Sequence, residues 1–223
     1  MAEKLSVIIP AFEAEKYIAQ AVDSVRKQNW AGEVEIIVID DGSGDNTVAA
    51  AQALGVTVLK KNRGGAASAR NEGLRQATGA LICLLDADDV LTEGALDALY
   101  GAMTEKGLDA VFAMAEDFIS PELTDAQKAE LKPRAAAYGG VLPGCSLIRK
   151  TVFDTVGLFD DTMKSGETVA WQMALRDGGI PTAQIPFVTL QRRLHLTNTG
   201  RVQQKQEMAN YAALLRKRMM KRP

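Results

Sequence analysis

The segment Ala80-Leu-Ile-Cys-Leu-Leu-Asp-Ala-Asp-Asp89 places an apolar run directly before three carboxylates. Such an unbroken run is typical of a strand that is buried on both faces of a sheet. Two earlier segments have the same organisation: Leu5–Ile9 is followed by Pro10, and Glu35–Ile39 is followed by Asp40-Asp41. The carboxyl ends of parallel strands form the ligand-binding side of a sheet. We therefore expect these acidic groups to share one rim.

Apolar residues at helical spacing fill the gaps between the predicted strands. The expected helices and the further strand are a helix from about Tyr17 to Gln28, a helix from Ser43 or Asp45 to Leu54, a strand at Val56–Leu59, a helix from Gly64-Gly65 to Ala77, and a helix capped by Thr92. Strands that alternate with helices in this way indicate an α/β fold with three layers and a mostly parallel central sheet.

The pattern is weaker after residue 108. We expect a strand at Asp109–Ala115, an extended segment at Val141–Ile148, a helix at Glu167–Arg176 and a last strand at Thr182–Leu190. The polar segment 116–134 fits either a mobile loop or a helix.

Composition excludes several classes of function. The chain has 223 residues, with 26 basic and 28 acidic side chains, two cysteines and one histidine. The near-neutral balance argues against a general nucleic-acid-binding protein. A four-cysteine zinc site and a multi-histidine metal cage are excluded by residue number. Carboxylates must therefore carry most of the polar chemistry of any enzyme site.

The acidic run at Asp86–Asp89 has two interpretations. Carboxylates packed together repel one another unless a cation lies among them, and Mg²⁺ or Mn²⁺ prefers such oxygen ligands. Alternatively, Asp88 and Asp89 favour the N-terminal dipole of the following helix. The buried strand before the run favours the metal site, because it delivers the charges to the ligand rim.

Two other segments reach the same predicted rim. A carboxylate of Asp40-Asp41 can accept hydrogen bonds from a base edge or a ribose hydroxyl, or it can belong to a helix cap with Ser43 and Asp45. Gly64-Gly65 opens a helix, so its backbone N–H groups suit an anion, and the alternative reason for the glycines is close packing of an Ala-rich helix on the sheet. Arg70 can pair with a phosphate, pair with a rim carboxylate, or remain solvated. Gly-x-Gly-x-x-Gly after the first strand and a Gly-Lys-Ser/Thr phosphate loop are both missing, which argues against dinucleotide-binding and P-loop proteins.

The order of these motifs resembles family 2 glycosyltransferases, which have the GT-A fold. The resemblance is carried by four segments within residues 5–91, and these are Ser6-Val-Ile-Ile-Pro-Ala-Phe12, Ile36-Ile-Val-Ile-Asp-Asp-Gly-Ser43, Asn62-Arg-Gly-Gly-Ala-Ala-Ser-Ala-Arg-Asn-Glu-Gly73 and Leu84-Leu-Asp-Ala-Asp-Asp89. Weaker similarity follows at Gly144–Lys150, Val156–Asp160 and Ser165–Glu167.

The resemblance implies a site for a nucleotide diphosphate sugar, with a UDP-sugar as the expected donor, and transfer to a hydroxyl acceptor with inversion. The implied nucleotide-binding residues are Pro10, Ala11, Phe12, Glu13, Asp40, Gly65, Arg70, Asp86 and Ala87. Asp88 is the implied ligand of Mn²⁺ or Mg²⁺, and His195 is a candidate to complete the metal shell, with Arg192 and Arg193 beside it to steady the diphosphate. A metal bound there neutralises the leaving group as a Lewis acid.

The catalytic base is the point at which the sequence departs from the family. The family has a Glu-Asp pair before a helix, whereas this chain has Glu167-Thr168. Threonine cannot act as a general base, so we expect Glu167 to take this role, with Asp160 and Asp161 as alternatives. Glu13 is a smaller departure, because the family often has asparagine there.

We expect one domain, 1–200, with a nucleotide-binding half at 1–106 and an acceptor half at 107–200, followed by a basic helix at 201–223. This tail has seven Lys or Arg against one Glu and either packs on the domain or contacts an anionic membrane. Free thiols and the absence of a long apolar segment favour a cytoplasmic location, with peripheral contact at the inner membrane face as the alternative.

The sequence thus predicts a metal-dependent inverting glycosyltransferase whose acceptor is a saccharide, a lipid-linked sugar or a peptide. Two alternatives stay open. One is a module that binds nucleotide sugars with weak or lost catalysis, and the other is a sugar nucleotidyltransferase.

Overall fold

The computed structural model describes residues 2–139, 143–163 and 165–198. Its strands are β1 (Leu5–Ala11), β2 (Val34–Asp40), β3 (Thr57–Lys60), β4 (Leu81–Leu84), β5 (Val90–Leu91), β6 (Ala110–Ile119), β7 (Tyr138–Gly139), β8 (Ser146–Arg149) and β9 (Thr182–Leu194). Its helices are α1 (Ile18–Arg26), α2 (Thr47–Ala53), α3 (Ala66–Gln76), α4 (Ala95–Lys106), α5 (Asp125–Ala129), α6 (Thr151–Val156) and α7 (Glu167–Asp177), with a short 3₁₀ turn at Pro143–Cys145.

One sheet runs through the described chain in the order β3-β2-β1-β4-β8-β6-β9-β5, and β7 pairs with β6. The pairs among β3, β2, β1 and β4 are parallel, as is the long pair of β6 with β9. The antiparallel pairs all involve the short strands β5, β7 and β8. The prediction of a mostly parallel α/β sheet is therefore confirmed.

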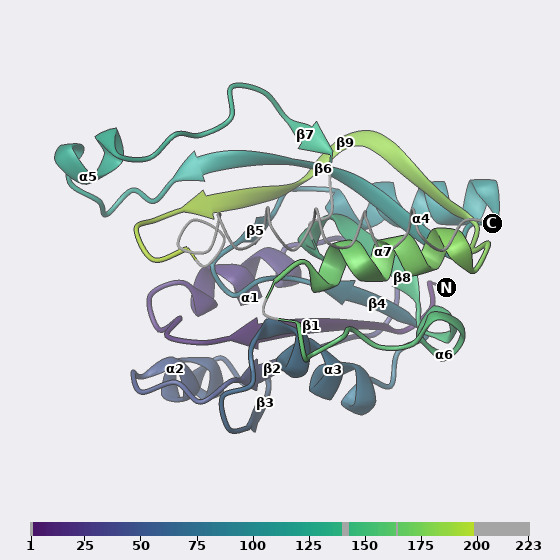
Figure 1. Ribbon diagram of the computed structural model, residues 1–223, viewed down its shortest axis with the longest axis horizontal. Coiled ribbons are helices and arrows are strands. Elements are labelled where there is room, and N and C mark those ends of the chain that lie inside the picture. Colours follow the sequence, from purple (N-terminus) through teal and green to yellow (C-terminus); the bar gives the residue numbers. More distant parts are fainter. Residues whose placement is uncertain (1, 140–142, 164, 199–223) are drawn as a thin grey trace.

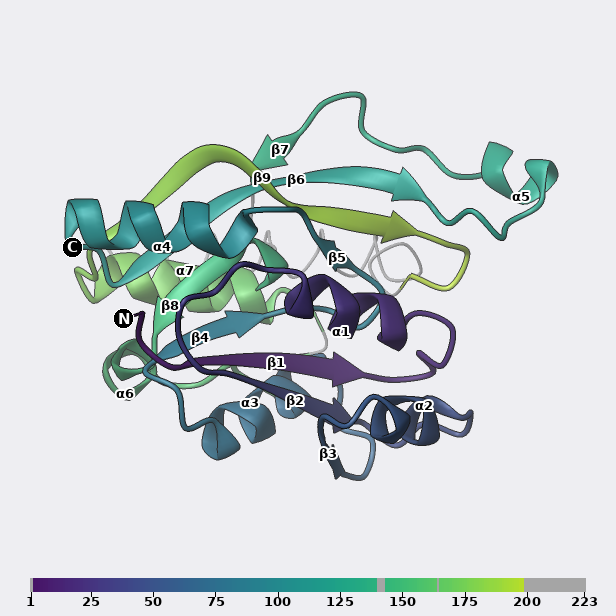
Figure 2. The same ribbon diagram turned by 180° about the vertical axis from the view of Figure 1, so that it is seen from behind.

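Helices cover both faces of the sheet and complete three layers (Figures 1 and 2). Helices α1, α2 and α4 bury their apolar residues against one face, and α3, α6 and α7 bury theirs against the other. Successive strand residues alternate between the two cores: Ile9 belongs to the first, and Ile8 to the second. Because both faces are covered, the strands are continuous apolar runs in the sequence.

A glycine lets α3 lie close to the sheet. A Cβ atom at Gly73 would stand 2.3 Å from Cγ2 of Ile8, far inside van der Waals contact. The Ala-rich sequence of α3 and this glycine therefore place the helix, and the Arg70 side chain that it carries, directly against β1.

Several element boundaries differ from those predicted. Thr92 does not cap α4, because the helix begins after Gly94. The Oγ1 of Thr92 instead donates to the carbonyl oxygen of Val188 at 2.6 Å. The polar segment 116–134 first continues β6 to Ile119 and then forms α5, and β9 extends past Leu190 to Leu194. The predicted extended segment 141–148 contains a 3₁₀ turn and β8 in its described part.

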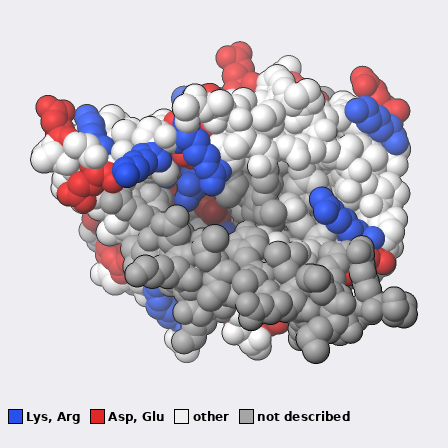
Figure 3. All heavy atoms as spheres, turned by 45° about the horizontal axis from the view of Figure 1, so that its top comes forward, with Lys and Arg blue, Asp and Glu red and all other residues white. Residues whose placement is uncertain are grey.

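Two predictions concern the tail and membrane contact. The basic helix predicted at 201–223 lies outside the described residues. Within the part of the chain that the structure describes, no helix combines the length and the apolar character needed to cross a membrane. On the described part of the face in Figure 3, basic and acidic side chains are interspersed rather than gathered into a large patch of one sign.

Candidate active site

The carboxyl ends of neighbouring parallel strands bring the predicted rim residues together. Ala11 of β1 is paired in register with Asp40 of β2, and Asp40 is paired with Lys60 of β3. On the other side of β1, Ile8 is paired with Leu84 of β4, two residues before Asp86. The segments that begin at Pro10, Asp40 and Asp86 therefore leave the sheet side by side, as the sequence predicts.

A buried arginine joins the rim to α7. Arg70 donates from Nη2 to Asp86 at 2.8 Å and from Nη1 to Glu167 at 3.0 Å. Its side chain is only 5% exposed, whereas those of Asp86 and Glu167 are 36% and 16% exposed. Burial lowers the pKa of Arg70, but the two carboxylates outweigh burial and the pKa is raised overall. Arg70 is therefore a fixed cation that holds two carboxylates 81 positions apart in the sequence.

In the group formed by Arg70, Asp86 and Glu167, one nitrogen of Arg70 and one oxygen of Glu167 make no hydrogen bond within the described residues. The Nε of Arg70 is buried and has no hydrogen-bond partner in the described structure. The Oε1 of Glu167 accepts from Arg70 and lies 3.4 Å from the Thr168 hydroxyl. Within the described residues, the hydrogen bonds of the Glu167 carboxylate are made by Oε1 and none by Oε2.

Asp88 and His195 lie together on the next part of the rim. Nε2 of His195 is 3.0 Å from Oδ2 of Asp88, and Nδ1 of His195 is 3.0 Å from Oγ1 of Thr197. Asn198 also donates to Oδ2 of Asp88 at 3.3 Å. The structure thus brings the predicted metal ligand and the only histidine of the chain within bonding distance, although they are 107 positions apart.

This pair fits a divalent ion that takes few protein ligands. In the described ranges, no group of three His, Cys, Asp or Glu side chains is arranged to hold a metal by itself. Mg²⁺ and similar ions often take one or two carboxylates and complete their shell with phosphate oxygens and water. An oxygen of Asp88 with a nitrogen of His195 is such a partial set, and Mn²⁺ accepts both ligand types.

Asp89 and Arg193 lock the loop that carries Asp88. Oδ1 of Asp89 accepts the backbone N–H of Arg193 at 2.9 Å. Burial, followed by the charges of Asp88 and Asp86, raises the pKa of Asp89 well above its ordinary value. Arg193 itself is 1% exposed and donates from Nε to the backbone oxygen of Asp88 at 2.8 Å.

The role predicted for Arg193 is therefore corrected. The two remaining guanidinium nitrogens of Arg193 donate to Ser120 and Gln20, and its plane lies near the rings of Tyr17 and Phe118. With each guanidinium nitrogen engaged inside the protein, this side chain fixes the loop and does not face a diphosphate. The sequence shows two adjacent arginines, and nothing in it indicates which one is buried.

The backbone N–H groups of the glycine pair before α3 are already hydrogen-bonded to a side chain of the protein. Asp41 accepts hydrogen bonds from the backbone N–H groups of Gly64 at 2.9 Å and Gly65 at 2.7 Å, and from Nζ of Lys61 at 2.7 Å. The prediction that the Gly65 N–H binds an anion of the ligand is corrected, since the anion is the Asp41 carboxylate. Asp41 thus has a structural role. Within the described residues, the carboxylate of its neighbour Asp40 accepts only long bonds of 3.4 Å from the Ser43 N–H.

A tight turn after β1 presents an aromatic ring at the rim. Glu13 has a φ of 51°, a left-handed conformation that is uncommon for residues other than glycine. Its backbone N–H donates to Ser43, and its Oε1 accepts from the Gly44 N–H. Phe12 is left 40% exposed, with the guanidinium of Arg63 3.1 Å from the centre of its ring.

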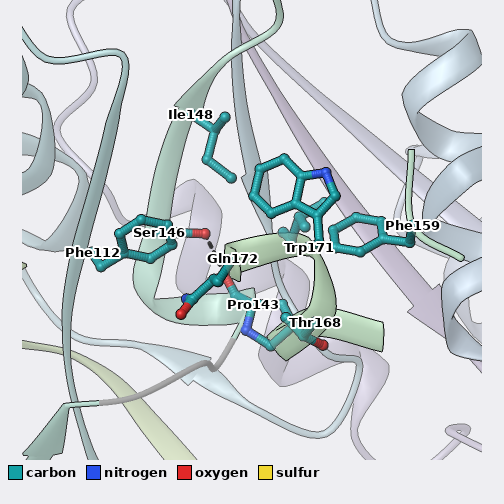
Figure 4. A pocket seen from close by; sticks show the side chains of 9 residues that line it. Phe112, Pro143, Ser146, Ile148, Phe159, Thr168, Trp171 and Gln172 are labelled. Atoms are coloured by element: carbon teal, nitrogen blue, oxygen red, sulfur yellow. Dashed lines mark hydrogen bonds between the residues drawn. The ribbon is translucent and has the colours of Figure 1, made fainter. Parts of the chain in front are cut away.

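A small aromatic-lined pocket lies beside the start of α7 (Figure 4). The residues that line it are Leu84, Phe112, Pro143, Ser146, Ile148, Phe159, Thr168, Trp171 and Gln172. Phe159 and Trp171 lie 5.2 Å apart between ring centres, which joins α7 to the segment between α6 and α7. Thr168 is the only residue of the Glu167-Thr168 pair that lines this pocket. Asp160, which the sequence offers as an alternative base, accepts hydrogen bonds from the backbone N–H and the hydroxyl of Thr162.

The amino-acid sequence is similar to those of known glycosyltransferases. Glycosyltransferase GlyG of Streptococcus pneumoniae is 32% identical over 183 residues, which is 70% of this chain and 60% of GlyG. The poly(ribitol-phosphate) beta-N-acetylglucosaminyltransferase TarS of Staphylococcus aureus is 36% identical over 100 residues, which is 42% of this chain and 18% of TarS. The chain thus spans about 60% of the length of GlyG and a smaller part of TarS.

Solved structures share the fold. Residues 1–349 of TarS superpose with a TM-score of 0.69 at 21% identity, over 85% of this chain and 60% of the TarS chain. The mannosyltransferase PcManGT from Pyrobaculum calidifontis superposes with a TM-score of 0.73 at 17% identity, over 97% of this chain and 65% of that one. The family model for Glycosyl transferase family 2 matches residues 6–157, more than half of the chain, and includes every rim segment from β1 to β4. This chain belongs to glycosyl transferase family 2.

Proposed function

We propose that this chain transfers a sugar from a nucleotide diphosphate sugar to an acceptor hydroxyl, with inversion at the anomeric carbon and with Mn²⁺ or Mg²⁺ as cofactor. The observation that carries the proposal is the arrangement of Asp86 and Glu167 on one buried arginine, next to the Asp88–His195 pair. A carboxylate free to take a proton and a partial metal site therefore lie on the same rim.

The donor is proposed from the rim and from the relatives. TarS has been solved in complex with UDP and with UDP-GlcNAc, and PcManGT in complex with GDP-Man and Mn²⁺. WfgD of Escherichia coli, 26% identical over 198 residues, is named a UDP-Glc:alpha-D-GlcNAc-diphosphoundecaprenol beta-1,3-glucosyltransferase. We infer a UDP-sugar donor and a saccharide or lipid-linked acceptor. The nucleotide belongs to residues 1–106 in this proposal, and the acceptor to residues 107–200.

Asp88 and His195 would hold the metal ion, which supplies a Lewis acid for the diphosphate leaving group. Phe12 would pack on the base, and the Asp40 carboxylate would accept a hydrogen bond from the nucleoside. Asp86 is fixed by Arg70, so that its second oxygen can orient the ribose or the sugar. These residues bind and orient the donor before any bond changes.

Glu167 is the proposed general base. Arg70 holds its Oε1, so that Oε2 can accept the proton of the acceptor hydroxyl while the hydroxyl oxygen attacks the anomeric carbon and the bond to the diphosphate breaks. Thr168 at the family's aspartate position cannot accept this proton. The arginine bond gives Glu167 a defined orientation, which is what a base needs for a directed transfer.

The test is a transfer assay on the wild-type chain and on Glu167→Gln, with UDP-glucose and UDP-GlcNAc, Mn²⁺ and simple saccharide acceptors. The glutamine keeps the shape and the bond to Arg70 but removes the base, so we expect a rate at least about 100-fold lower and nearly unchanged UDP binding. Equal rates would exclude Glu167 as the base. Donor binding by the wild-type chain without detectable transfer or hydrolysis would favour the alternative, a nucleotide-sugar-binding module, for which Thr168 is the supporting observation.

A further inference from the structure

The Phe12 ring is held in place at the rim. The turn that carries it is bonded twice to the loop after β2: the N–H of Glu13 donates to Ser43 at 3.0 Å, and Oε1 of Glu13 accepts from Gly44 at 2.7 Å. The ring nevertheless remains 40% exposed, and it is one of three large apolar side chains that are exposed in the described structure. The turn therefore presents a fixed aromatic face to whatever binds at the rim.

The guanidinium of Arg63 covers this ring. The backbone of this residue is fixed, because the next two N–H groups, of Gly64 and Gly65, both donate to Asp41. Its guanidinium makes no hydrogen bond or ion pair within the described residues, and it lies over the Phe12 ring, 3.1 Å from the ring centre. In this pair, Phe12 is the fixed member and the guanidinium is the movable one.

The distance between the Arg63 guanidinium and the Phe12 ring determines where a second planar group could stack. Stacked planar groups lie about 3.5 Å apart, so a base inserted between ring and guanidinium would need a gap of about 7 Å. The observed 3.1 Å leaves no room for insertion. A base that stacks on the face of Phe12 covered by Arg63 must first displace the guanidinium.

We propose that Arg63 is a placeholder for the nucleobase of the donor: it covers the Phe12 ring while the site is empty and gives up this position when the base arrives. The inference rests on the proposed function, in which Phe12 belongs to the nucleotide site. The placeholder weakens binding of every base-containing ligand, including the nucleotide product. Arg63 thus sets how tightly the nucleotide is held and how easily it leaves.

The experiment measures Kd for UDP with Mn²⁺ by calorimetry on the wild-type chain, Arg63→Ala and Lys60→Ala. Lys60 is an exposed cation at the end of β3 for which the structure gives no ring contact, so Lys60→Ala controls for lost positive charge. An exposed cation–π contact corresponds to a two- to fivefold change in affinity, and we expect Arg63→Ala to bind UDP tighter by about that factor. Lys60→Ala should bind UDP no tighter than wild type. Inorganic pyrophosphate, which has no base, should bind no tighter to either variant.

A double-mutant cycle with Phe12→Leu then attributes the gain to the ring. Without the aromatic platform, Arg63→Ala should bring no further gain in UDP affinity. Unchanged or weaker UDP binding by Arg63→Ala in the chain that keeps Phe12 overturns the placeholder. A gain that persists in the chain carrying Phe12→Leu does so as well. If neither the wild-type chain nor Arg63→Ala binds UDP, the proposed donor site fails first, and thermal unfolding of both chains shows that they are folded.

Discussion

Replacing Arg70 by methionine removes the cation that joins β4 to α7 while keeping a side chain of similar length. Two charge-assisted hydrogen bonds are lost, at 2.8 Å to Asp86 and 3.0 Å to Glu167, each worth about 1.5–3 kcal/mol. Part of this loss is offset, because the guanidinium no longer has to be desolvated and because the carboxylates, 36% and 16% exposed, can regain water. We expect the free energy of unfolding to fall by about 2–4 kcal/mol, which corresponds to about 5–15 °C in Tm for a chain of this size.

Urea unfolding followed by circular dichroism measures this loss, and the same helix supplies the control. Arg75 also forms an ion pair, with Glu72 at 3.2 Å, but the side chains of this pair are 54% and 35% exposed. Arg75→Met should therefore cost less than about 0.5 kcal/mol. Equal effects of the two substitutions, or a loss below about 1 kcal/mol for Arg70→Met, would refute the assignment of Arg70 as a buried structural cation. In a double-mutant cycle, Glu167→Gln should reduce the cost of Arg70→Met, because one carboxylate is then no longer left unpaired.

Three further outcomes follow from the same geometry. His195→Ala should weaken Mn²⁺ binding in the presence of UDP at least about tenfold, read by electron paramagnetic resonance of the free ion, and unchanged Mn²⁺ affinity would remove this residue from the metal shell. Gly73→Ala should destabilise the chain by about 1–3 kcal/mol in urea because its Cβ meets Ile8 at 2.3 Å, whereas Gly101→Ala in α4, with open space around it, should stabilise by up to about 1 kcal/mol. Burial raises the pKa of Cys83 and of Cys145 to about 12, so the folded chain should not react with Ellman's reagent at about pH 8, and reaction of two thiols should require denaturant.

The first half of the fold was predictable because one physical pattern governs it. Strands β1, β2 and β4 each contain a short apolar run that is mostly buried on both faces, at 7–9, 36–39 and 81–84, and rim residues follow each run within a few positions. The second half escapes this pattern. Strand β6 alternates between partly exposed and buried residues only at 112–115, and none of its last four residues is buried. Strands β5 and β7 have two residues each, too few for any periodicity to develop.

The site was predictable in its membership but not in its pairings. Sequence motifs identify Asp41, Arg70 and Arg193 as polar residues on or near the rim, and they do not indicate which charges neutralise one another inside the protein. That choice depends on contacts between residues far apart in the chain: Asp41 with the N-terminus of α3, Arg70 with Glu167, and Arg193 with the Asp88 backbone. A charged side chain that is buried needs a partner, and only the folded chain determines which one is within reach.

These pairings divide the rim charges into two classes with different consequences for function. Asp41, Asp89 and Arg193 are buried, and each makes at least one hydrogen bond to the backbone of a rim loop, so they fix where the loops lie. Asp86, Asp88 and Glu167 each keep partial exposure, and side chains rather than the backbone hold them: Arg70 holds Asp86 and Glu167, and His195 and Asn198 hold Asp88. A ligand can replace or share the bonds of the second class without unfolding the loops. The proposed chemistry therefore belongs to the second class, and substitutions in the first should reduce stability and donor binding together.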